Sequence, residues 1–145
     1  MIALAMSEIP TVRGRPDWRA ILEPYGFSPP SRTDWLTPRH VRYLYFMELG
    51  EMVKVGVSRD PKQRLNAFRA GQPRGLHLRS TIALPAVLAF QTERRVHAAL
   101  SDHAAGREWF KLRAKDANAI ARPICARAEA AAARLIECGF WHDQP

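Results

Sequence analysis

Residues 42–58 have the sequence RYLYFMELGEMVKVGVS, and this stretch decides the fold. Two runs of apolar and β-favouring residues flank a short segment that contains Gly50. Glycine supplies the backbone conformation of a tight turn, so the chain is expected to reverse direction there. Side chains alternate between the two faces of a strand, which places Tyr43 and Tyr45 on one shared face. The stretch therefore predicts a β-hairpin with two tyrosines on the same side.

A helix is expected directly after this hairpin. Asp60 and Pro61 form a helix start signal, and Gly71 is a stop signal at the other end. Between them, Leu65 and Phe68 have the spacing of side chains that pack inward together. The segment predicts a helix with one apolar stripe.

Alternating and then helical patterns follow along the chain. The period-two pattern of a third strand, which ends at Pro85, is formed by Leu76, Leu78, Ile82 and Leu84. A second helix is expected over about 86–100, and its residues available for burial are Leu88, Val96, Ala99 and Leu100. After the turn around Gly106, residues 107–112 predict another short strand or an extended edge.

The two ends of the chain differ from this middle part. Residues 1–38 are rich in proline and predict an arm with a short helix over Asp17–Glu23, whose apolar stripe is expected to dock onto the main domain. Trp35 and Leu36 are expected to dock likewise or to touch bases. Residues 114–137 are strongly helical in composition; Pro123 is expected to begin a new helix or to kink the existing one, and Gly139 to end it.

These elements predict an α/β fold. We expect a small three-stranded antiparallel or mixed sheet flanked by helices, formed by residues 39–113. The arm of residues 1–38 precedes this domain, and a helical extension of residues 114–145 follows it. The 145 residues, 47% of them hydrophobic, suffice for one core and leave no room for a second full-sized domain.

The charge favours a polyanionic partner. The formal net charge is +8 and the isoelectric point about 10.3, and 18 of the 22 basic residues are arginine. Each neutralised phosphate releases condensed counterions, and the planar guanidinium suits bidentate phosphate contacts. Nucleic acid is therefore the partner class that composition favours most.

The cysteines and the hydropathy of the sequence limit the cellular compartment and the kind of site that we expect. Cys125 and Cys138 lack the paired spacing of a zinc site, so we expect them to be reduced thiols. No apolar run is long enough to cross a bilayer, and residues 1–6 are too short and too uncharged for a secretory leader. We expect no membrane partner and a cytoplasmic location.

Five short motifs follow one another along the chain. They are Leu-Tyr45-Phe-Met, Val-Lys54-Val-Gly56-Val-Ser58, Arg64, Glu93-x-x-x-His97 and Glu108-Trp-Phe. In this order they resemble a compact branch of the GIY-YIG nuclease superfamily, in which the second motif has Lys-Ile-Gly or Lys-Val-Gly in place of Tyr-Ile-Gly. The resemblance covers about half of the chain, from Arg42 to Leu112.

The chain departs from that pattern at three places. The glycine and isoleucine of the first motif are absent; Tyr45 matches the hydrophobic-Tyr-hydrophobic-hydrophobic pattern, whereas counting back from Lys54 without a gap selects Tyr43. Lys54 replaces the tyrosine of the second motif. Phe68 stands where some members have a histidine one turn after the helical arginine.

The resemblance implies a metal-dependent endonuclease that cuts DNA. Hydrolysis of a phosphodiester needs an activated water, neutralised non-bridging oxygens and help for the leaving oxygen. Glu93 would hold one Mg²⁺ (or Mn²⁺), because Mg²⁺ commonly takes one or two carboxylates and keeps several waters. Arg64 would bridge the phosphate. Tyr45 or Tyr43 would accept a proton from water if Lys54 or the metal lowers the pKa of the phenol.

The remaining candidate residues have supporting roles in this interpretation. His97, one turn from Glu93, would relay a proton or orient the substrate. The residues expected to contact nucleic acid are Gly56, Ser58, Arg69, Arg94 and Glu108. Glu108 would alternatively order a water on the metal or only fix the fold. Trp109 and Phe110 are expected to be core anchors and not stacking platforms.

Three alternatives to this nuclease stay open. A zinc site formed by Glu93, His97 and His103 is one, although no HExxH pattern is present. A catalytically weak nucleic-acid-binding module on the same scaffold is the second, favoured by the altered first motif and by Phe68. A protein-interaction adaptor built on the C-terminal Ala-rich helices is the third. The sequence leaves the oligomeric state and the DNA target open.

Overall fold

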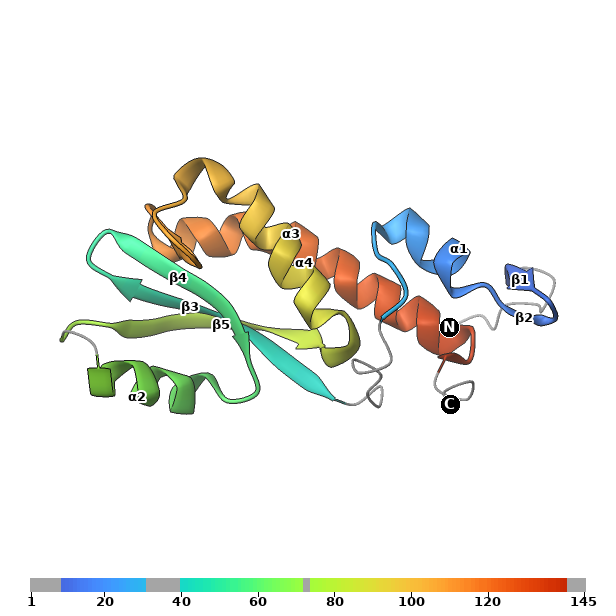
Figure 1. Ribbon diagram of the computed structural model, residues 1–145, viewed down its shortest axis with the longest axis horizontal. Coiled ribbons are helices and arrows are strands. Elements are labelled where there is room, and N and C mark those ends of the chain that lie inside the picture. Colours follow the sequence, from blue (N-terminus) through green and yellow to red (C-terminus); the bar gives the residue numbers. More distant parts are fainter. Residues whose placement is uncertain (1–8, 31–39, 72–73, 141–145) are drawn as a thin grey trace.

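The predicted hairpin is the centre of an antiparallel sheet in the computed structural model, which describes residues 9–30, 40–71 and 74–140 (Figure 1). The four strands, in the order in which they pair, are β5 (His77–Pro85), β3 (Val41–Leu49), β4 (Met52–Ser58) and β6 (Trp109–Phe110). Gly50 forms the turn with a φ of 59°. The small antiparallel sheet is confirmed; it has a fourth strand because residues 109–110 pair with β4.

Helices cover both faces of this sheet. α2 (Pro61–Gly71) lies on one face, and α3 (Ala89–Ala99) and α4 (Ala114–Glu137) lie on the other (Figure 1). Two single turns of 3₁₀-helix, η4 (Ala86–Leu88) and η5 (Ser101–His103), flank α3. Asp60 begins α2 as expected, because its carboxylate accepts the Gln63 N–H at 3.1 Å. The sheet flanked by helices therefore matches the predicted α/β class.

A bulge in β5 divides the apolar residues of this strand between the two faces. Phe46 pairs with Ser80 and the next residue, Met47, pairs with Leu78, so β5 has one extra residue at Arg79. Leu76 and Leu78 consequently pack on the α2 side, whereas Ile82 and Leu84 pack toward α3 and α4. The period-two pattern predicted the strand but not this change of face.

The N-terminal arm packs on the C-terminal half of α4. Its elements are β1 (Thr11–Val12), β2 (Arg15–Pro16), α1 (Trp18–Leu22) and η2 (Glu23–Tyr25). The predicted short helix is confirmed and is capped by Asp17, which accepts the Ala20 N–H at 3.2 Å. Ile21 and Leu22 share a core cluster with Leu135, so the stripe docks onto α4. Trp35 and Leu36 lie outside the described residues.

α4 is one helix, which corrects a sequence prediction. It runs through Pro123, so the expectation that a new helix begins there is wrong. A stripe of small residues, including Ala117, Ala121 and Ala128, is fully buried and packs both halves of the helix onto the core despite the backbone hydrogen bond that Pro123 removes.

A second correction concerns α3. Ala99, which was available for burial, is exposed because Val96 and Leu100 occupy the core face one turn apart.

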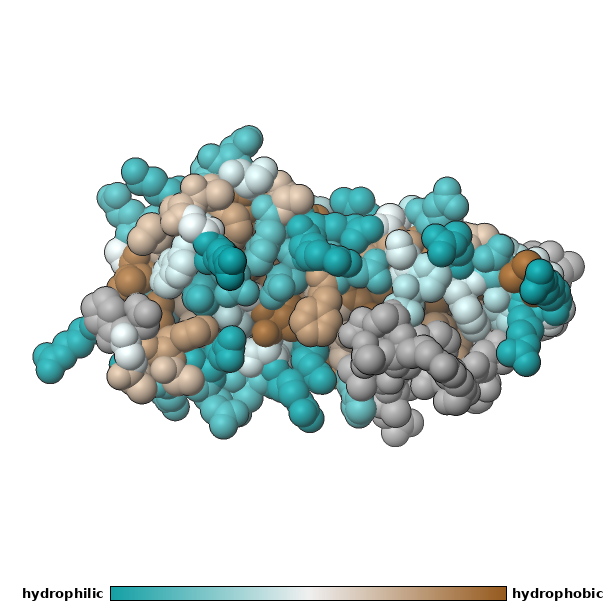
Figure 2. Space-filling view, viewed as in Figure 1, coloured by the Kyte–Doolittle hydropathy of each residue, from teal (hydrophilic) through white to brown (hydrophobic). Residues whose placement is uncertain are grey.

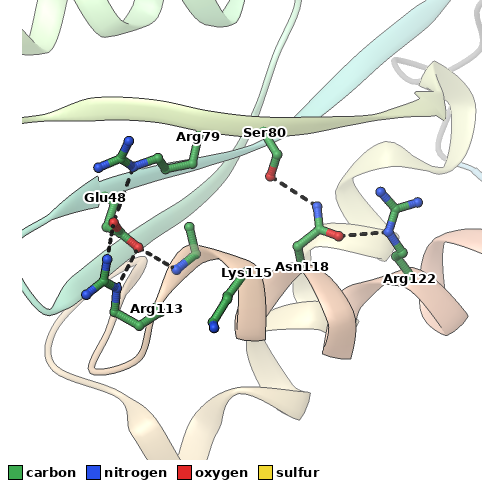
Figure 3. Close-up of a pocket in the computed structure, with 8 residues that line it drawn as sticks. Glu48, Arg79, Ser80, Arg113, Lys115, Asn118 and Arg122 are labelled. Carbon is green, nitrogen blue, oxygen red and sulfur yellow. Dashed lines mark hydrogen bonds and ion pairs between the residues drawn. The ribbon is translucent and has the colours of Figure 1, made fainter.

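The start of α4 is tied to the sheet by a buried carboxylate, Glu48 (Figure 3). Its side chain is 5% exposed and accepts the backbone N–H of Ala114 at 2.8 Å. Arg113 and Arg79 each donate to it at 3.2 Å. The Ala114 N–H, helped by the two guanidiniums, lowers the pKa of Glu48 despite its burial. Glu48 thus accepts a hydrogen bond from a backbone N–H at the start of α4, which has no side-chain cap from its own N-cap residue.

Two further expectations about the chain can be checked in the described residues. Cys125 and Cys138 are buried free thiols, as predicted. Within the described ranges, no helix is both long and apolar enough to cross a membrane.

Candidate active site

The outer edge of β4 gathers side chains from several elements. β6 pairs with Val53 and Lys54, and beyond them the Val55 N–H donates to the backbone oxygen of Glu108 at 2.9 Å. The Val55 oxygen lies 2.8 Å from Nε2 of His97. The amide of Val57, two residues further along β4, lies close enough to the carboxylate of Glu93 to lower its pKa through hydrogen bonding. The hydrogen-bonding groups of this edge therefore fix Glu93, His97 and Glu108 beside one another.

Tyr45 reaches the same place from β3. It pairs with Gly56 on β4, and a Cβ built on Gly56 would lie 2.7 Å from Cζ of the Tyr45 ring and closer still to its hydroxyl. The ring therefore lies across the glycine. The guanidinium of Arg64, from α2, lies close enough to the phenol oxygen to lower the pKa of Tyr45 through hydrogen bonding and through its charge. Arg64 itself is exposed, so its other donors face solvent.

Burial controls the ionisation of this phenol. Desolvation, together with the negative charges of Glu108 and Glu93, raises the pKa of Tyr45 to about 12, although Arg64 acts in the opposite direction. Lys54 was expected to lower this pKa, but Arg64 is the cation that does so.

The charge of Glu108 acts on the carboxylate of Glu93. Glu93 is half-buried, and desolvation raises its pKa; the charge of Glu108 acts in the same direction, against His97 and the Val57 N–H. Glu108 occupies a left-handed backbone conformation with a φ of 60°. Non-glycine residues adopt this conformation rarely, and it often marks a functional site. Bringing two carboxylates together favours a cation between them.

Lys54 and Phe68 line the other side of Glu108. The Lys54 ammonium lies 3.4 Å from Oε2 of Glu108 and 4.5 Å from the centre of the Phe68 ring. The Arg64 guanidinium lies 5.0 Å from the same ring. Phe68 thus supports two cations at once, an arrangement that a histidine charged at low pH would oppose. The residue that departs from the resembled pattern has a physical function here.

Tyr43 lies on the same face but lines a different pocket. It pairs with Ser58 and borders a pocket of about 320 Å³ beside Asp60 and Lys62, at the start of α2. Neither Glu93 nor Glu108 is among the described residues that line it. The shared face of the two tyrosines is confirmed, and Tyr45 is the tyrosine that shares electrostatic interactions with Arg64 and Glu93.

Three other predicted residues have contacts of their own. Ser58 accepts the Asp60 N–H at 3.0 Å and so shapes the turn into α2. Arg69 directs two donors at the Leu76 oxygen, at 3.1 and 2.8 Å, and fastens α2 to the start of β5. Arg94 is exposed and lines a pocket together with Glu93.

The zinc alternative finds no support in the geometry. Among the described residues, no group of three His, Cys, Asp or Glu side chains is arranged to hold a metal ion. His103 is an exposed residue of η5 and does not complete a site with Glu93 and His97. Phe110 is buried and Trp109 partly buried in the two cores, which confirms them as anchors.

Comparisons with known proteins identify one domain family. No curated protein and no solved structure matches the chain. A family profile, the T5orf172 domain, matches residues 42–125 and so includes β3 to the middle of α4 and every candidate catalytic residue. That domain is associated with homing and GIY-YIG-like nuclease-related proteins. The match spans more than half of the 145 residues, and the chain therefore belongs to the T5orf172 domain family.

Proposed function

We propose that this chain is a metal-dependent endonuclease of the GIY-YIG type that hydrolyses DNA phosphodiester bonds. The observation that carries the proposal is the convergence of three groups from three elements. Arg64 on α2 and Glu93 on α3 both lie close enough to the Tyr45 phenol on β3 to shift its pKa, in opposite directions. A phenol, a guanidinium and a carboxylate are the groups that phosphodiester hydrolysis needs.

Arg64 is the residue that would bind the scissile phosphate. Its guanidinium is exposed and anchored at one side by the phenol and by the Phe68 ring. The other N–H groups of the guanidinium face the solvent, where a non-bridging phosphate oxygen can accept hydrogen bonds from them. Arg64 would therefore neutralise charge that grows on the phosphate as the water attacks.

Glu93 and Glu108 fit the requirements of Mg²⁺ or Mn²⁺. Two mutually repelling carboxylates, one of them with a raised pKa, offer the small set of oxygen ligands that Mg²⁺ takes while it keeps its waters. When bound, the divalent cation would supply positive charge for the leaving oxygen and for activation of water. Glu93 is the principal ligand in this proposal, because Glu108 is also paired with Lys54.

Tyr45 would take a proton from the attacking water while it passes its own proton to Glu108, the carboxylate whose charge acts most strongly on the phenol. Its pKa of about 12 makes the phenol neutral at pH 7, so it can accept a proton only while it gives up its own. The negative charges of Glu93 and Glu108 contribute to that high value. Any positive charge that compensates these carboxylates would bring the phenol closer to the range of a useful base.

His97 would be a positioning residue. A carbonyl oxygen only accepts, so Nε2 of His97 carries a hydrogen and donates it to Val55 at 2.8 Å. This contact holds α3 at the β4 edge and fixes the distance of Glu93 from the strand. His97 also packs against Phe110, with ring centres 5.3 Å apart.

The surface is consistent with a nucleic-acid partner. Hydrophilic side chains cover most of the face seen in Figure 2. A pocket of about 700 Å³ at the start of α4 is lined by four cations and one carboxylate: Arg79, Arg113, Lys115, Arg122 and Glu48 (Figure 3). This excess of positive charge at the opposite edge of the sheet favours contact with a polyanion. It also suits the second candidate function, a catalytically weak DNA-binding module on the same scaffold.

Nicking of supercoiled plasmid by the full chain, with Mg²⁺ or Mn²⁺, tests the proposal. Glu93→Ala should abolish nicking and leave DNA affinity unchanged, because the carboxylate serves the metal and not the DNA. Glu129→Ala, which removes an exposed carboxylate of α4, is the matched control and should nick normally. A chain that binds DNA but never nicks, under conditions in which a known nuclease cuts, would leave the binding module as the better interpretation.

A further inference from the structure

A second pocket opens beside Glu93. It has a volume of about 540 Å³ and lies between α3, which contributes Phe90, Glu93 and Arg94, and the segment after η2, which contributes Ser28 and Pro29. Glu93 and Arg94 follow Phe90 by three and four residues, so each lies next to Phe90 on the helix surface. The pocket thus shares a wall with the candidate active site.

Phe90 is an aromatic side chain with no role in the core. It is 61% exposed, the highest value among the large hydrophobic side chains of the described residues. Its neighbour on the chain, Ala89, is buried, so the helix does face the core at this point. An exposed aromatic ring beside an exposed arginine is the combination that binds single-stranded nucleic acid, by stacking and by phosphate contact.

The opposite wall of the pocket is held firmly in place. The Gln91 side chain pairs with the Ser28 backbone through two hydrogen bonds of 2.9 Å each. One residue earlier, the Phe27 ring is buried and lies 4.5 Å below the Arg95 guanidinium. Pro29 therefore belongs to a segment that is held against α3. Phe90, Val87 and Pro29 give the pocket an apolar lining, and Glu93 and Arg94 add one charge of each sign.

The spacing suits a nucleotide next to the cleaved bond. Phe90 and Glu93 line the same pocket, one turn apart on α3. A base stacked on Phe90 would therefore lie beside the position proposed for the scissile phosphate. In a duplex both faces of a base are covered by its neighbours, so only an unstacked base can use the ring.

We propose that this pocket binds one unpaired nucleobase that flanks the scissile phosphate, stacked on Phe90, with Arg94 on the adjoining phosphate. The position of the cleaved bond in this inference rests on the proposed function. It names the substrate class: DNA with an unpaired or flipped base beside the cleavage position. It also gives the N-terminal arm a function, since Ser28 and Pro29 form the wall that faces Phe90.

Binding measured without metal tests this proposal separately from cleavage. Fluorescence anisotropy in EDTA would compare the full chain on two labelled single strands, oligothymidine and an abasic oligomer with the same number of phosphates. Phe90→Ala should weaken binding to oligothymidine by about 5- to 100-fold, the effect of one lost stacking contact, and leave binding to the abasic strand unchanged. Phe90→Trp should keep the preference for the strand with bases.

A control and the contrary outcomes complete the design. Ile136→Ala, which truncates another exposed apolar side chain at 49% exposure, should change neither affinity. The proposal is overturned if Phe90→Ala binds both strands as the wild type does, if it weakens both equally, or if the wild type does not distinguish them. A chain that never nicks DNA but shows the base-dependent loss at Phe90 would contradict the nuclease proposal alone.

Discussion

The phenol ring of Tyr45 lies directly across Gly56, its pairing partner on the neighbouring strand. A Cβ at position 56 would be 2.7 Å from Cζ and 3.1 Å from Cε2 of that ring. Tyr45 is 1% exposed, so its ring is packed inside the core. A residue without a side chain is therefore what allows the phenol to cross the strand toward Arg64 and the β4 edge.

Gly56→Ala should consequently damage both stability and activity. We expect a loss of about 1–3 kcal/mol in the free energy of unfolding, the usual effect of overpacking a core. Displacing the phenol by a fraction of its width should lower the rate of DNA cleavage by about 100-fold. Chemical denaturation and single-turnover cleavage with saturating protein measure the two effects.

Gly71→Ala is the matched control for this variant. Gly71 lies in the last turn of α2, and a Cβ there would meet no described atom within 4 Å. This variant should keep wild-type activity and be at least as stable as the wild type, because alanine favours the helical backbone more than glycine does. Equal behaviour of the Gly56 and Gly71 variants would show that the glycine is not needed for the position of the phenol.

The hairpin and its register were predictable from the sequence. Gly50 fixes the turn, and with Leu49 opposite Met52 a simple count places Tyr45 opposite Gly56. The order of elements follows from start and stop signals such as Asp60 and Gly71. Local chemistry determines these features, so a single sequence is sufficient for them.

Other parts of the site depend on contacts between distant segments. The left-handed conformation of Glu108 turns its carboxylate toward Lys54, and no local signal marks a glutamate for that conformation. The extra residue at Arg79 shifts one half of β5 to the other face, although the apolar pattern is unbroken. Phe68 was interpreted as a lost base, but its neighbours make it a support for two cations. Each of these three features depends on residues that are distant in the sequence, so the local sequence alone does not predict it.

Glu93→Gln should stabilise the protein at neutral pH in the absence of metal. Burial raises the pKa of Glu93 in the folded state, so between its ordinary value of 4.5 and that raised value the folded chain holds more protons than the unfolded one. Stability then falls as pH rises through this window, and above it the ionised carboxylate is a constant cost. Glutamine removes that cost, and we expect a gain of about 0.5–2 kcal/mol.

Thermal unfolding in EDTA at several pH values measures this gain. The difference between the two proteins should vanish below the ordinary pKa of 4.5, where Glu93 is protonated in both states. Added Mg²⁺ should raise the Tm of the wild type and leave that of the variant unchanged, because a ligand that binds the folded state stabilises it. A variant less stable than the wild type at neutral pH would contradict the account.

Glu48→Gln should loosen the start of α4. The lowered pKa of Glu48 means that its stabilising contribution is complete above its ordinary value of 4.5 and is lost as pH falls through the lower folded value. We expect the variant to lose about 1–2 kcal/mol at neutral pH, toward the low end for charged hydrogen bonds because both arginines are more than half exposed. The difference from the wild type should close in acid. Glu51→Gln, at the exposed hairpin turn, should change nothing at any pH.

A pair of phenylalanine variants decides which tyrosine participates in cleavage. Tyr45→Phe removes the hydroxyl that Arg64 contacts and keeps the ring that fills the space over Gly56. Stability should change little, whereas the rate of DNA cleavage should fall by about 10²- to 10⁴-fold, as expected for a lost proton-transfer group. Tyr43→Phe alters the separate pocket beside Asp60 and should cleave at the wild-type rate. Single-turnover rates on one DNA substrate compare the two. The opposite order would mean that the ungapped count from Lys54 identifies the right tyrosine, and that the phenol at the β4 edge only packs the core.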